Sequence, residues 1–198
     1  MGRGNRANQE RLEGRAPTRD KILLMSIYAT IFEALQKDAI PFVVIGGHAV
    51  VLHGYQRNTF DLDLLVPEGS LPAAKSVLVQ LGYTPYFESG AFLQLTPCTG
   101  LPPLDLMIVD EITFTRLSHF TEARVFDGWT IQIPDPKRLV AMKLHALKAV
   151  SRLNREKDWD DIAGVIRASN LDIEDREFKE IVQTYGSPGA VDEIKGRL

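Results

Sequence analysis

The chain has 198 residues, of which 44% are hydrophobic and 25% are charged, and it carries a net charge of −3. This composition is typical of a globular protein and fits one domain, or one domain with a helical appendage. The small acidic excess excludes a strongly basic nucleic-acid-binding protein, although a local basic surface stays compatible with it. Cys98 is the only cysteine, which excludes an internal disulfide framework and a zinc site built from several cysteines.

The sequence contains no segment that predicts membrane insertion. No apolar run approaches the roughly 20 residues that cross a bilayer, and the arginine-containing N-terminus lacks the apolar stretch of a secretory signal. Together with the single cysteine, these features predict a cytoplasmic protein without membrane contact. We expect residues 1–19 to form a flexible basic tail, with a weak tether to phosphate backbones as the alternative.

The first half of the chain combines predicted helices with short strands. Apolar residues recur at helical spacing from Lys21 to Asp38, which predicts an amphipathic helix that ends before Pro41. Further on, Gly46-Gly47 separates a short apolar run from a second helix. The elements predicted after the first helix are a strand over 42–45, a helix over 48–54, a strand over 60–66 and a helix over 72–81.

The second half begins with strands and ends with helices. Ser89-Gly90 and Asp127-Gly128 mark the turns of two predicted hairpins. The predicted strands cover residues 83–88, 91–96, 104–109, 124–126 and 129–133, and the predicted helices cover 137–151, 157–168 and 175–185. The sequence therefore predicts a mixed α/β fold of the α+β type, with a core over residues 20–134 and a helical region over 135–198 packed on it.

Three aspartates interrupt two of the apolar predicted strands. Asp61 and Asp63 lie two residues apart in "FDLDLLV", and Asp105 lies between two leucines in "PLDLMIV". Because residues two apart in a strand share a face, we expect the three carboxylates on one face of the sheet if the strands are neighbours. The alternative is that they are exposed polar faces of amphipathic strands, although aspartate is unfavourable in strands.

A cluster of three carboxylates predicts a metal site. Unpaired carboxylates repel one another and need a cation to be stable together. Hard oxygen ligands favour Mg²⁺ or Mn²⁺, and one such cluster can hold two ions for phosphoryl or nucleotidyl transfer.

Residues upstream of the aspartates suggest a phosphate at the same site. Gly46-Gly47 opens a predicted helix, where backbone N–H groups can approach a phosphate. Arg57 could bind a phosphate or balance the acidic residues, and Thr59, on the predicted strand face of Asp61, could orient a carboxylate.

The stretch "GGHAVVLHGYQRNTFDLDLLV" resembles the DNA polymerase β-like nucleotidyltransferase superfamily. The signature of that superfamily is Gly-Gly or Gly-Ser at a helix start, then Asp-x-Asp, then a third Asp on a later strand. The stretch is most similar to the minimal bacterial branch, including the AbiEii-like nucleotidyltransferases of toxin–antitoxin systems. The resemblance is strongest over residues 41–66 and extends more loosely to about residue 167 through "PLDLMIV" and "MKLHALKAVSRLNREKDWDDI". It implies a nucleotidyltransferase-like mixed sheet with flanking helices, followed by a helical part.

The resemblance also implies roles for the matching residues. The catalytic and metal-binding residues would be Asp61, Asp63 and Asp105, with Asp105 completing the metal site or acting as base toward the acceptor. The nucleotide-binding residues would be Gly46, Gly47, His48, Arg57, Thr59, Lys143 and Asp158. His48 departs from many relatives, which carry a small or hydroxyl-bearing residue there. Lys143 would contact the triphosphate, and Asp158 or Asp161 would contact the base, the ribose or Lys143.

The predicted function is metal-dependent transfer of a nucleoside monophosphate from a nucleoside triphosphate to an acceptor hydroxyl. The acceptor is open among tRNA or another RNA, a protein and a small molecule such as an aminoglycoside. A first alternative is a non-catalytic nucleotide-binding module, or one that binds a toxin–antitoxin partner. A second alternative is a metal-dependent hydrolase, which would release a free nucleotide instead of an adduct.

Overall fold

A computed structural model describes residues 27–98, 100–149 and 154–198 of the chain. The predicted basic tail over residues 1–19 and the first part of the predicted N-terminal helix lie outside the described residues. The described part of that helix is α2 (Ile27–Lys37), whose apolar residues Ile31, Phe32 and Leu35 are fully buried. The helical prediction is therefore confirmed over this part.

A five-stranded sheet brings together segments that are distant in the sequence. Its order is β1-β2-β5-β4-β3, in which β2 and β5 are parallel and the other neighbours are antiparallel. The strands are β1 (Val43–Val44), β2 (Leu62–Pro67), β3 (Thr84–Glu88), β4 (Phe92–Thr96) and β5 (Leu104–Val109). Each corresponds to a predicted strand, and the mixed α/β fold class is confirmed.

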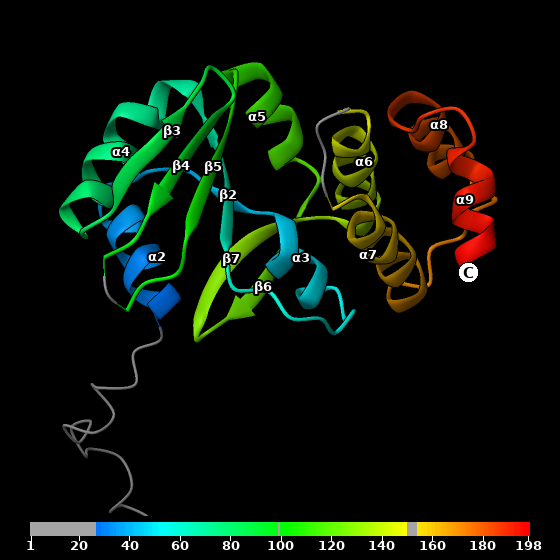
Figure 1. Ribbon diagram of the computed structural model, residues 1–198, viewed down its shortest axis with the longest axis horizontal. Helices are drawn as coiled ribbons and strands as arrows, with labels where there is room; N and C mark the ends of the chain where they lie inside the picture. Colours follow the sequence, from blue (N-terminus) through cyan, green and yellow to red (C-terminus); the bar gives the residue numbers. More distant parts are fainter. Residues whose placement is uncertain (1–26, 99, 150–153) are drawn as a thin grey trace, which may run out of the picture.

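One face of the sheet packs into the main hydrophobic core. In β5, Leu104, Leu106 and Ile108 alternate with outward residues and are buried in this core. The helices α2 and α4 pack together and contribute their apolar faces to the same cluster (Figure 1). The remaining elements of this half are α3 (Gly46–Leu52), a short 3-10 turn (Glu68–Ser70), α4 (Leu71–Gln80) and α5 (Glu111–Ser118).

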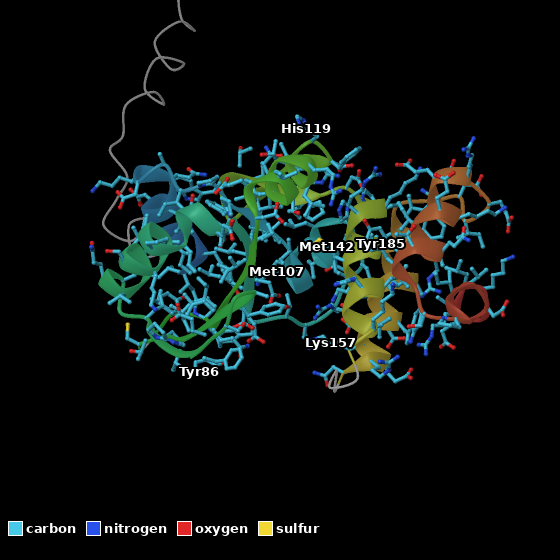
Figure 2. The ribbon with its side chains drawn as sticks, turned by 90° about the horizontal axis from the view of Figure 1, so that it is seen from above. Tyr86, Met107, His119, Met142, Lys157 and Tyr185 are labelled. Atoms are coloured by element: carbon cyan, nitrogen blue, oxygen red, sulfur yellow. The ribbon has the colours of Figure 1, made fainter. Side chains whose placement is uncertain are left out.

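The opposite face of the sheet is covered by a smaller cluster. Leu65 of β2 packs there with Met107 of β5, Phe114 of α5 and Met142 of the helix α6 (Pro136–Leu147). Figure 2 shows Met107 and Met142 close to each other in the middle of the molecule, between the sheet and the C-terminal helices. This face is therefore directed toward α6, and it also carries Asp63 of β2 and Asp105 of β5.

A hairpin follows, formed by β6 (Thr121–Phe126) and β7 (Trp129–Pro134). Asp127 and Gly128 both have positive φ, 58° and 83°, as a two-residue type I′ turn requires. β7 contacts β1, and its buried residues Ile131 and Ile133 join the main core. The prediction of a hairpin at Asp127-Gly128 is confirmed.

The chain ends in helices that stand beside the sheet (Figure 1). They are α6 (Pro136–Leu147), α7 (Arg155–Ala168), α8 (Arg176–Tyr185) and α9 (Ala190–Arg197). Asp135 and Asp175 begin α6 and α8 by accepting a hydrogen bond from the backbone N–H three residues later. The first three helices confirm predicted elements, whereas α5 and α9 were not among the predicted elements. None of the helices that the structure describes is long and apolar enough to cross a membrane.

Candidate active site

Asp63 of β2 and Asp105 of β5 form the centre of the candidate site. The parallel register of the two strands places Asp63 directly beside Asp105. Both alternate with buried leucines, so their side chains project from the same face of the sheet. In the next strand, Gln94 pairs with Asp105, and its amide donates a 3.0 Å hydrogen bond to Oδ2 of Asp105. The condition for the expected convergence, that the two acidic strands are neighbours in the sheet, is met.

The electrostatics of this pair favour a cation. Burial raises the pKa of Asp63, and the adjacent Asp105 raises it further. Burial also raises the pKa of Asp105, partly opposed by the hydrogen bond from Gln94. In the part of the chain that the structure describes, neither carboxylate forms an ion pair with a basic side chain. Two adjacent, partly desolvated carboxylates of this kind bind either a proton or a metal ion.

Asp61 lies just before β2 and not within it. β2 begins at Leu62, and Asp61 is exposed in the preceding loop, so the expected common strand face of Thr59, Asp61 and Asp63 is not observed. The charge of Asp61 nevertheless raises the pKa values of both Asp63 and Asp105, which places it near the pair. Among the described residues, no three His, Cys, Asp or Glu side chains form a group that could hold a metal ion. The assignment of three metal ligands stays a prediction.

Gly46 and Gly47 leave room for the side chains of the site. Gly46 has a φ of 62°, in the left-handed region that favours glycine. A Cβ atom at Gly46 would collide with the carboxylate of Asp63, and one at Gly47 would collide with Thr59 and Arg57. The N–H of Gly47 donates a 3.4 Å hydrogen bond to Oδ2 of Asp63. The glycine pair therefore lets the start of α3 approach the acidic strand closely.

The side chain of His48 is part of an aromatic cluster. Its ring packs against those of Tyr28 and Phe126, with centroid distances of 4.8 Å in both cases. Burial, together with the charge of Arg57, lowers the pKa of His48 to about 4. The ring is therefore neutral at pH 7 and supplies no positive charge for a phosphate. Its Nε2 is buried without a hydrogen-bond partner among the residues that the structure describes.

The two predicted phosphate-binding cations are held by carboxylates of α7. Nε of Arg57 lies 2.7 Å from Oδ1 of Asp161, as a buried ion pair. Nζ of Lys143, on α6, donates hydrogen bonds of 3.0 Å to Asp158 and 2.7 Å to Asp161. Asp161 is fully buried and bridges the two cations. The charge of Lys143 also lowers the pKa of Asp63, which connects this ionic cluster to the acidic pair.

The structure thus brings the predicted residues into one region. The contact of Asp158 and Asp161 with Lys143, one of the alternatives that the resemblance implies, is observed, whereas Arg57 and Asp105 have partners that the sequence does not predict. Arg57 pairs with Asp161 and not with the acids that follow it in the chain. Gln94 was not predicted as a site residue. Its position between the buried residues Leu93 and Leu95 nevertheless indicates that it lies on the polar face of β4. No local pattern indicates that Asp161 joins Arg57 to Lys143, because the three residues meet only through tertiary packing.

Two solved structures share this fold. One is ANT(2″)-Ia in complex with adenylyl-2″-tobramycin, with a TM-score of 0.61 and 16% identity over 81% of this chain and 95% of that chain. The other is the lincosamide antibiotic adenylyltransferase LnuA bound to lincomycin, with a TM-score of 0.55 and 13% identity over 70% of this chain and 94% of that chain. No curated protein matches the chain in sequence. At these identities, the likeness shows the fold alone.

A family comparison adds evidence from the sequence. Residues 11–186 match the model of a family described as "Uncharacterised nucleotidyltransferase", which is most of the 198-residue chain. The predicted membership of the polymerase β-like superfamily is confirmed, whereas the narrower AbiEii-like branch stays a prediction. The chain belongs to this nucleotidyltransferase family and has the polymerase β-like fold.

Proposed function

We propose that the protein is a metal-dependent nucleotidyltransferase, which moves a nucleoside monophosphate from a nucleoside triphosphate to an acceptor hydroxyl and releases pyrophosphate. The observation that carries this proposal is the adjacent pair of Asp63 and Asp105, without basic partners among the described residues. The pair lies against the Gly46-Gly47 turn, and Lys143 lies within electrostatic reach.

The acidic pair fits one or two Mg²⁺ or Mn²⁺ ions. Its two carboxylates are adjacent, and the charge of Asp105 makes Asp63 harder to ionise without a compensating positive charge. We propose that Asp63 and Asp105 hold the ions and that Asp61 supplies a third carboxylate from the loop. Bound ions of this kind neutralise the phosphate charge and orient the reacting groups.

The residues of the chain would then bind the triphosphate and move one proton. The N–H of Gly47, together with Arg57 and Lys143, places positive charge beside the acids, where the phosphates would lie. Asp105 lies beside the proposed metal site, where it would accept the proton of the acceptor hydroxyl. The acceptor oxygen forms a bond to the α-phosphorus while the bond from that phosphorus to pyrophosphate breaks. Positioning and charge neutralisation supply most of the rate.

The acceptor is proposed from three classes: tRNA or another RNA, a protein, or a small molecule. The names of the two similar structures refer to tobramycin and lincomycin, and we include an aminoglycoside and a lincosamide among the small molecules to be tested. A toxin–antitoxin partner and the AbiEii-like branch also stay proposals. The alternative function is a nucleotide-binding module without catalysis.

The proposal is tested by transfer of label from the four α-³²P nucleoside triphosphates, with Mg²⁺ or Mn²⁺. The acceptors are the RNA, protein and small-molecule fractions of a bacterial lysate. The inactive control is the double variant Asp61→Asn/Asp63→Asn, and the matched control is Asp160→Asn, because Asp160 is an exposed aspartate that pairs with Arg197.

We expect label in one fraction with the wild type and with Asp160→Asn, and none with the double variant. Nucleotide that binds without any transfer would favour the binding module. Release of free nucleoside monophosphate would favour a hydrolase.

A further inference from the structure

The loop between α3 and β2 (residues 53–61, the α3–β2 loop) follows one face of α7. Gly54 lies against Ala168, since a Cβ atom at Gly54 would be 3.4 Å from that of Ala168. The ring of Tyr55 fills the space beside Gly164, where a Cβ atom would collide with the ring. Two residues further along the loop, Arg57 pairs with Asp161 at 2.7 Å.

These contacts occur in regular order along the helix. As the loop runs forward through 54, 55 and 57, its partners run backward through 168, 164 and 161. Positions three and four apart lie on the same face of an α-helix. A single face of α7 therefore receives the loop.

Both the loop and the helix are fixed by further contacts. Nε2 of His53, at the start of the loop, donates a 2.8 Å hydrogen bond to the carbonyl oxygen of Pro134. On α7, Asp161 uses its second oxygen to bind Nζ of Lys143 at 2.7 Å. The helix face that receives the loop is thereby tied to α6.

The loop carries residues that the proposed function uses. Arg57 and Thr59 lie over Gly47, and Asp61 ends the loop beside the acidic pair. A change in the path of the loop would move these groups relative to Asp63, which is fixed in β2. Even small misplacement of such groups costs a large factor in rate or affinity.

We propose that α7 holds the α3–β2 loop in the position that nucleotide binding requires, with Asp161 and Gly164 as positioning residues. This inference rests on the proposed nucleotidyltransferase function. In this role Asp161 fixes the direction of Arg57, and Gly164 provides the space that Tyr55 needs to hold the loop against the helix.

The test compares Gly164→Ala with Gly196→Ala. Alanine favours helix over glycine at both positions, but a Cβ atom at Gly196 has no neighbour within 4 Å. A second pair of variants compares Asp161→Asn with Asp160→Asn. The carboxylate of Asp160 is exposed on the same helix. Gly164→Ala keeps the test independent of Asp161→Asn, which removes a buried charge and can impair folding.

Two quantities are measured for each variant: amide hydrogen exchange of residues 53–61, and the kinetics of nucleotidyl transfer. We expect Gly164→Ala and Asp161→Asn to exchange in the loop about tenfold faster than their controls. The KM for the nucleoside triphosphate should rise about tenfold. A loss of folded protein alone would lower the apparent kcat and leave KM unchanged.

Unchanged exchange in the loop would overturn the inference, and so would faster exchange with an unchanged KM. A wild-type protein that transfers no nucleotide would instead overturn the proposed function. The exchange rates would then still decide whether α7 holds the loop.

Discussion

Two pairs of carboxylates lie close together in this protein, one buried on α7 and one half-buried on the sheet, and they differ in how their charge is balanced. On α7, Asp158 and Asp161 are neutralised by Lys143, and Asp161 also by Arg57. On the sheet, Asp63 and Asp105 have only hydrogen bonds from neutral donors among the described residues. The neutralised pair fits a structural, positioning role. The unneutralised pair is where we propose that a metal ion binds.

The largest effect is expected from breaking the neutralised pair. Lys143→Met leaves Asp158 and Asp161 buried without their common ammonium group, and it should lower the free energy of unfolding by about 3–5 kcal/mol. Lys157→Met, on an exposed residue of α7, should change it by less than about 0.5 kcal/mol. Urea unfolding at pH 7 measures both. Similar small losses in the two variants would show that the buried pair adds nothing to stability.

The unneutralised pair should respond in the opposite way. Asp63→Asn or Asp105→Asn should lower nucleotidyl transfer by about 10²–10³-fold, while the protein stays folded. Because burial raises the pKa of Asp63 in the folded state, wild-type stability falls as the pH rises from the unfolded-state pKa to the folded-state pKa. Asp63→Asn removes this penalty and keeps the shape of the side chain, so it should be at least as stable as the wild type in urea at pH 7. A clearly less stable variant would mean that Asp63 has a structural partner.

A smaller effect is expected from filling the space beside Asp63. Gly46→Ala places a non-glycine residue at positive φ, which costs about 1–2 kcal/mol, and its Cβ atom pushes the carboxylate of Asp63 away. Transfer should fall about tenfold or more. Gly90→Ala, at a position with no neighbour within 4 Å, should leave both transfer and thermal stability unchanged. Normal transfer by Gly46→Ala would show that the position of Asp63 is not critical.

The smallest effect is expected from His48, whose neutral ring is influenced by the charge of Arg57. The pKa of His48 is about 4 in the folded state against 6.5 in the unfolded state. The unfolded chain therefore binds the proton more readily between these values, and stability is lost as the pH falls from about 6.5 toward 4. Thermal unfolding of His48→Gln across this range should show a shallower dependence on pH than the wild type. Equal slopes would mean that another group titrates in this window.

The sequence predicts the pair of Asp63 and Asp105 better than the ion pairs of Arg57 and Lys143, because the first depends on a local pattern and the second on contacts between distant segments. Alternation of leucine and aspartate in β2 and β5 is a local pattern that fixes which face each carboxylate occupies. The pairing of Arg57 with Asp161 depends on how α7 packs on the core, which no local spacing encodes. Asp61 was placed in the strand because the polar-apolar alternation continues through Phe60, but β2 begins only at Leu62.

The helix α5 shows the same limit at the level of the fold. The segment Glu111–Ser118 forms α5 after the N-cap Asp110, whose carboxylate accepts a hydrogen bond from the N–H of Thr113. The apolar residues of this segment are Ile112, Phe114 and Leu117, of which only the last two are spaced as on one helix face, so the segment lacks the strong apolar periodicity that predicts a helix. Such a helix is recognised by its cap and by tertiary contacts.

The register of β2 and β5 protects the acidic pair against change elsewhere in the chain. A slip of one residue between these strands would turn the buried leucines outward, and the core would resist it strongly. The exposed turn at residues 89–91 between β3 and β4 can therefore vary in length or sequence without separating Asp63 from Asp105, whereas α4 and β4 carry core residues. A protein engineer could graft new acceptor-binding segments there and keep the reacting centre intact.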